Sequence, residues 1–202
     1  GTVTDAPGGV PDATTHSIRP PGYCRTYMDL SVVARYEPQT VEDAEREAAV
    51  IAPVISRTDG DHLLFTKRAD HLGEHPGQMS SPGGGREPSD ADLEATALRE
   101  ANEEIGLRAD EADIVGYLDD VRTVSEYAVR PFVARVPDRT YDPDEREVAE
   151  IAVLPVAGLT DLDNYESERR DHHYYGEIRL HFFYVNGYTV WGATGRMLVQ
   201  LL

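Results

Sequence analysis

One stretch of the sequence restricts the fold of this chain more than any other: three successive glycines stand shortly before a helix-forming segment. Gly83–Gly85 carries no side chains, so its backbone can turn tightly and approach a neighbouring group closely. From Asp90 to Ile105 the apolar and alanine residues recur at helical spacing. Ser89 or Asp90 can cap this helix, and Gly106 is well suited to end it. We therefore expect a glycine turn just before a helix, where backbone N–H groups and the positive helix end can approach phosphates.

The same helix carries a charged sequence, Arg99-Glu100-Ala101-Asn102-Glu103-Glu104. Glu100 stands three residues before Glu103 and four before Glu104, so the three carboxylates converge on one helix face. Their repulsion would cost roughly a few tenths of a kcal/mol per pair. A divalent cation such as Mg²⁺ would convert that repulsion into coordination. Arg99 can pair with Glu103 four residues later. The opposite face offers small and apolar residues to a core: Leu93, Ala97, Ala101 and Ile105.

A solvated acidic face is the alternative interpretation, because the whole chain is acidic. It has 37 acidic and 19 basic residues and a formal net charge of −18. Such a surface repels nucleic acid and anionic membranes, so neither is an expected partner. Lys67 is the only lysine. Lysine depletion together with an excess of acids favours adaptation to high salt, and an ordinary acidic protein from an arginine-favouring genome is the alternative.

Length and composition favour one domain in a reducing compartment. The 202 residues are enough for one sizeable core. Residues 1–27 lack apolar periodicity and are expected to form a flexible tail, which leaves residues 28–202 as a single domain. There is no apolar run of about 18 residues and no secretory signal. The lone Cys24 cannot form an internal disulfide and zinc-binding patterns are absent, so we expect a cytoplasmic protein.

The remaining elements indicate an α/β chain with a mixed sheet and helices packed on it. Residues 40–47 are compatible with a helix, and residues 161–176 are expected to be loop-like. Two hairpins are predicted, one across the turn at residues 58–61 and one across Asn186-Gly187. A closing helix is expected from Thr194 to Leu202. The predicted strands are residues 48–55, 62–67, 114–121, 128–136, 147–155, 181–185 and 188–191.

The stretch from Gly83-Gly84 to Arg99–Leu107 resembles the Nudix box. That family cleaves nucleoside diphosphates linked to another moiety, using Mg²⁺ or Mn²⁺ and an attacking water. The resemblance implies the Nudix fold, an α+β sandwich in which a mixed β-sheet packs between helices. It implies metal binding by the three helix glutamates, a catalytic contribution from Arg99, and proton transfer to one of those glutamates or to Glu147 on a later strand. The predicted metal ligands are Glu100, Glu103 and Glu104, and the predicted catalytic residues are Arg99, Glu100, Glu103 and Glu147.

The box departs from the family pattern at two points. Fourteen residues separate Gly83-Gly84 from Arg99-Glu100, one more than usual. Ala91 stands where a glutamate is usual, eight positions before the arginine, and Glu87 or Asp90 could substitute for it.

The longer spacing is typical of the coenzyme A pyrophosphatase branch. The segment from Leu63 to Ala69, followed by His75-Pro76-Gly77-Gln78 and Pro82–Gly84, resembles the extra motif of that branch. Ser81 departs from it where an aromatic residue is usual, and Gly73 where a basic residue is common. The segments Asp119-Asp120, Glu147–Glu150 and Trp191–Arg196 also fit the branch. The resemblance implies hydrolysis of coenzyme A to 4′-phosphopantetheine and adenosine 3′,5′-diphosphate, and it makes a homodimer plausible.

An acidic protein that binds such a substrate needs local cations. Lys67, Arg68 and Arg86 flank the glycine turn and could bind phosphates beside Gly83 and Gly84, although surface salt bridges are the alternative for each. Arg68 is favoured because it matches the family motif.

Two other functions stay open. The chain could be a Nudix hydrolase acting on ADP-ribose or a dinucleotide polyphosphate, or a non-catalytic Nudix-like binding module. The presence of all three helix glutamates favours an enzyme. His75 is either a substrate contact or a loop-stabilising residue. The neighbours His172 and His173 are expected to point apart, so no metal site is predicted there.

Overall fold

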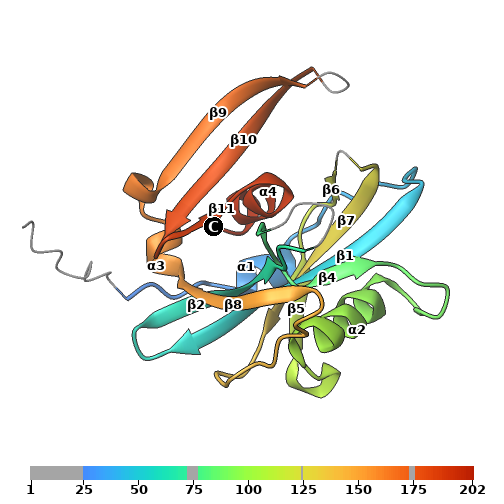
Figure 1. Ribbon diagram of the computed structural model, residues 1–202, viewed down its shortest axis with the longest axis horizontal. Helices are drawn as coiled ribbons and strands as arrows, with labels where there is room; N and C mark the ends of the chain where they lie inside the picture. Colours follow the sequence, from blue (N-terminus) through green and yellow to red (C-terminus); the bar gives the residue numbers. More distant parts are fainter. Residues whose placement is uncertain (1–24, 72–76, 124, 173–175) are drawn as a thin grey trace, which may run out of the picture.

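The computed structural model describes residues 25–71, 77–123, 125–172 and 176–202, with the side chain of His172 excepted (Figure 1). Cys24, Gly73, His75 and His173 therefore lie outside the described residues. The helices are α1 Ser31–Arg35, α2 Leu93–Ile105, α3 Val156–Leu159 and α4 Gly192–Leu201, with two short 3-10 helices at Ala109–Glu111 and Leu162–Asn164. The strands are β1 Arg46–Arg57, β2 Gly60–Arg68, β3 Met79–Ser80, β4 Gly83–Gly85, β5 Asp113–Tyr117, β6 Val121–Arg122, β7 Tyr127–Arg135, β8 Val148–Pro155, β9 Tyr165–His172, β10 Gly176–Val185 and β11 Tyr188–Val190.

A mixed eight-stranded sheet forms the centre of the molecule. Strand β1 runs parallel to β7 and antiparallel to β2 and β4, and β8 pairs with the other edge of β2. The main strand order is β3-β2-β1-β7-β5. The hairpin predicted across residues 58–61 is confirmed, because β1 and β2 pair antiparallel from Val54↔Leu63 to Arg57↔Gly60.

Helices cover both faces of this sheet, which confirms the predicted α+β sandwich. On one face α2 buries Ala97, Ala101 and Ile105 against Ile51 and Phe132. On the other face, α4 and the segment at α1 pack against a core that contains Leu30, Val54, Phe65, Val133 and Leu198. Alternate residues of β1 and β2 enter opposite cores because successive strand side chains point to opposite faces. Each buried aliphatic side chain stabilises the fold by about 1.5–3 kcal/mol.

A smaller three-stranded sheet, β11-β10-β9, carries a long hairpin that extends away from the main sheet (Figure 1). Its base joins the core through Phe183, Val185 and Val190. Asn186 and Gly187 adopt φ of 53° and 82°, as expected for the tight turn between β10 and β11, so the second predicted hairpin is confirmed.

Several local predictions were wrong. Residues 41–45 form bends before β1 and no helix. Residues 165–172 form strand β9, although a loop was expected, because pairing with β10 satisfies the backbone of this highly charged segment. The single strand expected at residues 114–121 is two strands, β5 and β6. Helix α2 begins at Leu93 with Asp92 as its cap, whose side chain accepts a hydrogen bond from Ala95 N–H. The predicted end at Gly106 is confirmed, with φ of 66°.

The N-terminal segment falls mostly outside the described residues. Thr26, within the expected tail, pairs with Gly60, and its carbonyl accepts a hydrogen bond from Asp61 N–H at 2.8 Å. No helix in the described part of the chain is both long and apolar enough to cross a membrane.

Candidate active site

The three glycines form strand β4, which lies between β1 and the later turns of α2. Gly84 pairs with Ala49 of β1, and Gly83 has φ of 155°. A Cβ atom on Gly83 would lie 2.3 Å from the Ala49 carbonyl oxygen, and one on Gly84 would lie 2.5 Å from Glu100 Cδ. Only glycine fits at position 83, where a side chain would meet backbone, whereas a side chain at position 84 would have to displace the Glu100 carboxylate. The expectation of a turn at the helix N-terminus was wrong, because pairing with β1 carries the glycines alongside Glu100 instead.

Arg99 holds the glycine strand, the helix and the preceding loop together. Its Nη2 donates to the Gly85 carbonyl at 3.0 Å, and its Nη1 donates to Glu100 Oε1 at 2.9 Å. Two further bonds reach Asp90, at 2.9 Å from Nε and 3.1 Å from Nη2. The expected pairing with Glu103 exists but is longer, at 3.5 Å.

Asp90 supplies the carboxylate that the sequence lacks at Ala91. Only 5% of its side chain is exposed, and it also accepts hydrogen bonds from Thr96 Oγ1 and from Glu87 N–H. The Arg99 guanidinium is the main reason that the pKa of Asp90 lies well below its usual range. Of the two substitutes considered from the sequence, Asp90 therefore makes the contact, while the exposed Glu87 lies 4.0 Å from Arg99.

Glu104 is the carboxylate most affected by its surroundings. Its Oε2 accepts a hydrogen bond from Gly83 N–H at 3.3 Å. Burial raises the pKa of Glu104 to about 8, and the nearby charges of Glu100 and Glu147 act in the same direction. Burial also raises the pKa of Glu100, against the opposing effect of Arg99. Negative charge at this end of the site is thus only partly neutralised by the protein's own cations.

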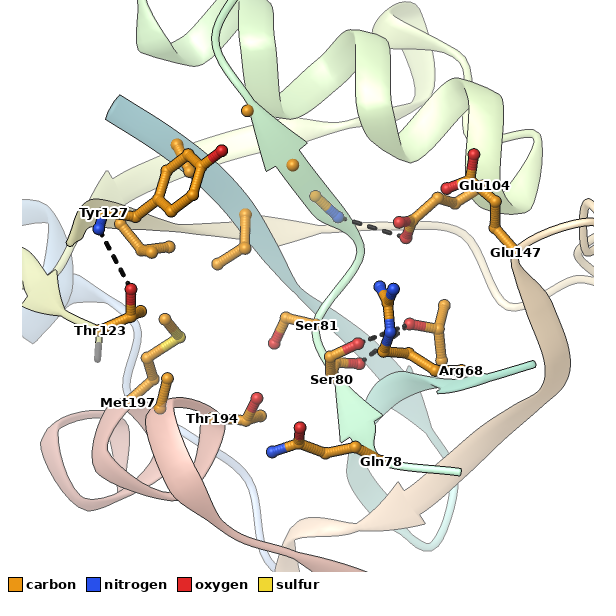
Figure 2. Close-up of a pocket in the computed structure, with 18 of the residues that line it drawn as sticks. Arg68, Gln78, Ser80, Ser81, Glu104, Thr123, Tyr127, Glu147, Thr194 and Met197 are labelled. Atoms are coloured by element: carbon orange, nitrogen blue, oxygen red, sulfur yellow. Dashed lines mark hydrogen bonds between the residues drawn. The ribbon is translucent and has the colours of Figure 1, made fainter. Parts of the chain in front are cut away.

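A cavity of about 290 Å³ opens beside Glu104 and the glycine strand (Figure 2). Five of the predicted site residues line it: Arg68, Gly83, Gly84, Glu104 and Glu147. Arg68 comes from the end of β2, and Glu147 directly precedes β8. Figure 2 shows Glu104 and Glu147 near each other on one side of the cavity, with Arg68 below them.

The other five predicted residues, Arg99 among them, lie outside the lining of this cavity. Glu100 lies against the glycine strand at Gly84 but does not reach the cavity. Glu103 points outward, with 59% of its side chain exposed. The end of Lys67 lies near Gly77. Arg86 donates to Glu47 at 2.7 Å, which is the surface salt bridge considered as its alternative role.

The carboxylates fit a hard divalent cation by their chemistry, although their side chains do not converge on one point. Among the described residues, no three His, Cys, Asp or Glu side chains come close enough together to hold a metal ion. Glu100 is turned toward Arg99, and Glu104 toward Gly83. Carboxylate oxygens are nevertheless the donors that Mg²⁺ and Mn²⁺ prefer.

Sequence reasoning missed the opposite wall of the cavity. Thr123, Tyr127, Thr194 and Met197 line it, and Gln78 is a further lining residue that was not predicted. Gln78 and Thr194 stand inside segments that matched the family pattern, so a signal existed for them. Thr123 and Tyr127 flank the start of β7 and carry no motif.

Comparison with known proteins gives a consistent result. The NUDIX domain family model matches residues 45–175. An uncharacterized Nudix hydrolase NudL of Enterobacter sp. (strain 638) is 37% identical over 160 residues, covering 77% of this chain and 81% of that protein. A NudL of Yersinia enterocolitica is 34% identical over 173 residues, covering 82% and 84%. The solved NUDIX domain of Shewanella oneidensis NrtR, complexed with ADP ribose, aligns with a TM-score of 0.47 and 17% identity over 64% of this chain and 84% of that chain.

Proposed function

This chain belongs to the Nudix hydrolase family, and we propose that it hydrolyses the diphosphate bond of coenzyme A or its derivatives. The products are 4′-phosphopantetheine, or its acyl form, and adenosine 3′,5′-diphosphate. One observation carries the choice of substrate. Arg68 and Gln78, from the segment that resembles the coenzyme A pyrophosphatase motif, line the same cavity as Glu104 of the Nudix helix.

Glu100, Glu103 and Glu104 would hold Mg²⁺ or Mn²⁺. When bound, such an ion neutralises phosphate charge and lowers the pKa of a water molecule. The oxygen of an attacking water would form a bond to one phosphorus, and the bond from this phosphorus to the bridging oxygen would break. The bridging oxygen leaves on the other phosphate. The proton of the water passes to Glu147 or to one of the three helix glutamates.

The other site residues bind and position. Arg68 pairs with the diphosphate through charge-assisted hydrogen bonds, and its place in the cavity lining supports this role. Gly83 and Gly84 offer a backbone that can lie close to the substrate. Arg99 positions Glu100 through their 2.9 Å ion pair. Lys67 and Arg86 lie outside the cavity lining, so we assign them no contact with the phosphates in the cavity.

A panel of diphosphate substrates tests this proposal. Wild-type protein is assayed with coenzyme A, ADP-ribose and a dinucleotide polyphosphate, in Mg²⁺, in Mn²⁺ and with a chelator. We expect the highest kcat/KM on coenzyme A and no activity with the chelator. A preference for ADP-ribose or for a dinucleotide polyphosphate would make the chain a Nudix hydrolase of another specificity. Tight binding without turnover would make it a binding module.

Repeating the panel at low and high salt tests the adaptation to salt proposed from the net charge of −18. Adaptation to salt predicts activity that is kept or raised at high salt. The cytoplasmic location and the homodimer stay predictions from the sequence and the family resemblance.

A further inference from the structure

The candidate active-site cavity has two chemically different sides. Figure 2 shows Glu104, Glu147 and Arg68 on one side, and Thr123, Tyr127, Met197 and Thr194 on the other. The first three are the only residues with a charged side chain among the described residues that line the cavity. The second side, completed by Val129, has hydroxyl groups and apolar surface. We call Thr123, Tyr127, Val129, Thr194 and Met197 the neutral lobe.

Coenzyme A also has two different arms beyond its diphosphate. The adenosine arm carries a 3′-phosphate, whereas the pantetheine arm has two amides, a hydroxyl, a pair of geminal methyl groups and a thiol, all uncharged at neutral pH. Burying the charged phosphate in the neutral lobe would leave it without a cation among the described lining residues, which is unfavourable. The cavity volume of about 290 Å³ is at the lower end for small-molecule sites, so one arm is enough to fill it.

Tyr127 does not make the lobe a slot for an adenine ring. Its ring is the one aromatic side chain among the described lining residues, and the Arg46 guanidinium lies 5.4 Å from its centroid. An adenine base could therefore stack on one aromatic ring at most, so the lobe would select adenine only weakly over the uncharged arm.

From these observations we infer that the neutral lobe binds the pantetheine arm of the substrate and excludes the adenosine arm. The inference rests on the proposed function. Val129 and Met197 provide apolar contact for the geminal methyls, and the hydroxyls of Thr123 and Thr194 provide hydrogen bonds for the amides and hydroxyl. The substrate thus lies with its diphosphate between Arg68 and the glutamates, and its uncharged arm runs toward α4.

Ser81 borders this lobe. It is buried, with 8% exposed, at the position where the resemblance leads to an aromatic residue. Ser81, Thr194 and Met197 together line both the main cavity and a small apolar hollow behind it.

The test uses the two halves of coenzyme A as competing inhibitors of its hydrolysis. Inhibition constants for 4′-phosphopantetheine and adenosine 3′,5′-diphosphate are measured in wild-type protein and in Thr194→Leu, which narrows the lobe from the helix side. We expect Thr194→Leu to raise the constant for 4′-phosphopantetheine about tenfold or more and to change the other less than about twofold. Val199→Leu adds apolar volume to the exposed side of the same helix, where 46% of Val199 is exposed, and is the control. Met197→Phe narrows the lobe from the same helix and replaces Thr194→Leu if that variant does not fold.

Two results would overturn the inference. A larger change for adenosine 3′,5′-diphosphate would place the adenosine arm in the lobe, and no change for either half would leave the lobe without a role in binding. Failure of the proposed function is distinguishable, because wild-type protein itself would then not cleave coenzyme A.

Discussion

Arg99 and Asp90, nine residues apart in the chain, are joined by two hydrogen bonds of 2.9 and 3.1 Å. The same guanidinium donates to Glu100 and to the Gly85 carbonyl, so a single side chain fixes the loop before α2, the glycine strand and the acidic helix face. This pairing explains how the box tolerates Ala91: the neighbouring aspartate provides the carboxylate.

Replacing Asp90 by asparagine should therefore loosen Arg99 and, through it, the position of Glu100. Asp90→Asn removes the charge that holds Arg99 and leaves the arginine freer to move. We expect kcat/KM to fall about tenfold or more, as is usual for supporting residues of metal sites, and Tm to fall by about a few degrees. Glu87→Gln is the matched control, because Glu87 is exposed and 4.0 Å from Arg99. Equal effects of the two changes would contradict a special role for Asp90.

Glu100 should matter for turnover far more than for folding. Glu100→Gln keeps the size of the side chain but removes a charge proposed to bind the metal. Since each 1.36 kcal/mol of lost transition-state stabilisation is a factor of ten, a loss of about 100-fold or more in kcat is expected. Glu94→Gln, on an exposed position of the same helix, should behave like wild type. Activity retained in Glu100→Gln would remove this residue from the metal site.

The glycine strand gives a steric test. In Gly84→Ala the new methyl would meet the Glu100 carboxylate at 2.5 Å and must displace it, so we expect a large loss of activity. In Gly85→Ala the nearest atom to the new methyl is Tyr127 Cε1 at 3.9 Å, an ordinary contact, and a much smaller loss is expected. Steady-state kinetics of the two variants would contradict this geometry if Gly85→Ala were the more damaging change.

The raised pKa of Glu104 should make the stability of the folded protein depend on pH in metal-free buffer. The pKa of Glu104 rises from 4.5 to about 8 in the folded protein, so the folded state holds a proton that the unfolded chain releases. Its contribution to stability is full below pH 4.5 and is lost as the pH rises through 8, on the order of a few kcal/mol. Glu104→Gln has no proton to release there and avoids this loss. In thermal unfolding, the difference in Tm between Glu104→Gln and wild type should therefore shift in favour of the variant as the pH rises from 5 to 9. A difference that does not vary with pH would be evidence against the raised pKa.

The parts of this protein that were predictable depend on local patterns. Helix α2 and the two hairpins follow from periodicity, Gly106 and Asn186-Gly187, which act over a few residues. Strand β9 was missed because its charged sequence has no strand pattern of its own, and only pairing with β10 defines it.

The arrangement of the site was less predictable for the same reason. The glycines were expected at the start of α2, and long-range pairing of Gly84 with Ala49 moves them beside Glu100. The neutral lobe is formed by Thr123, β7 and α4, and α4 is far from the other two in the chain, so residues such as Tyr127 and Met197 carry no signal that could have linked them.

The most direct test of the account is the identity of the products that wild-type protein releases from coenzyme A. The reaction is run with Mg²⁺ or Mn²⁺, and mass detection follows every product over time. The account predicts equal amounts of 4′-phosphopantetheine and adenosine 3′,5′-diphosphate, and none of either when a chelator is present. Intact coenzyme A in the presence of metal, or cleavage at any bond other than the diphosphate, would contradict it.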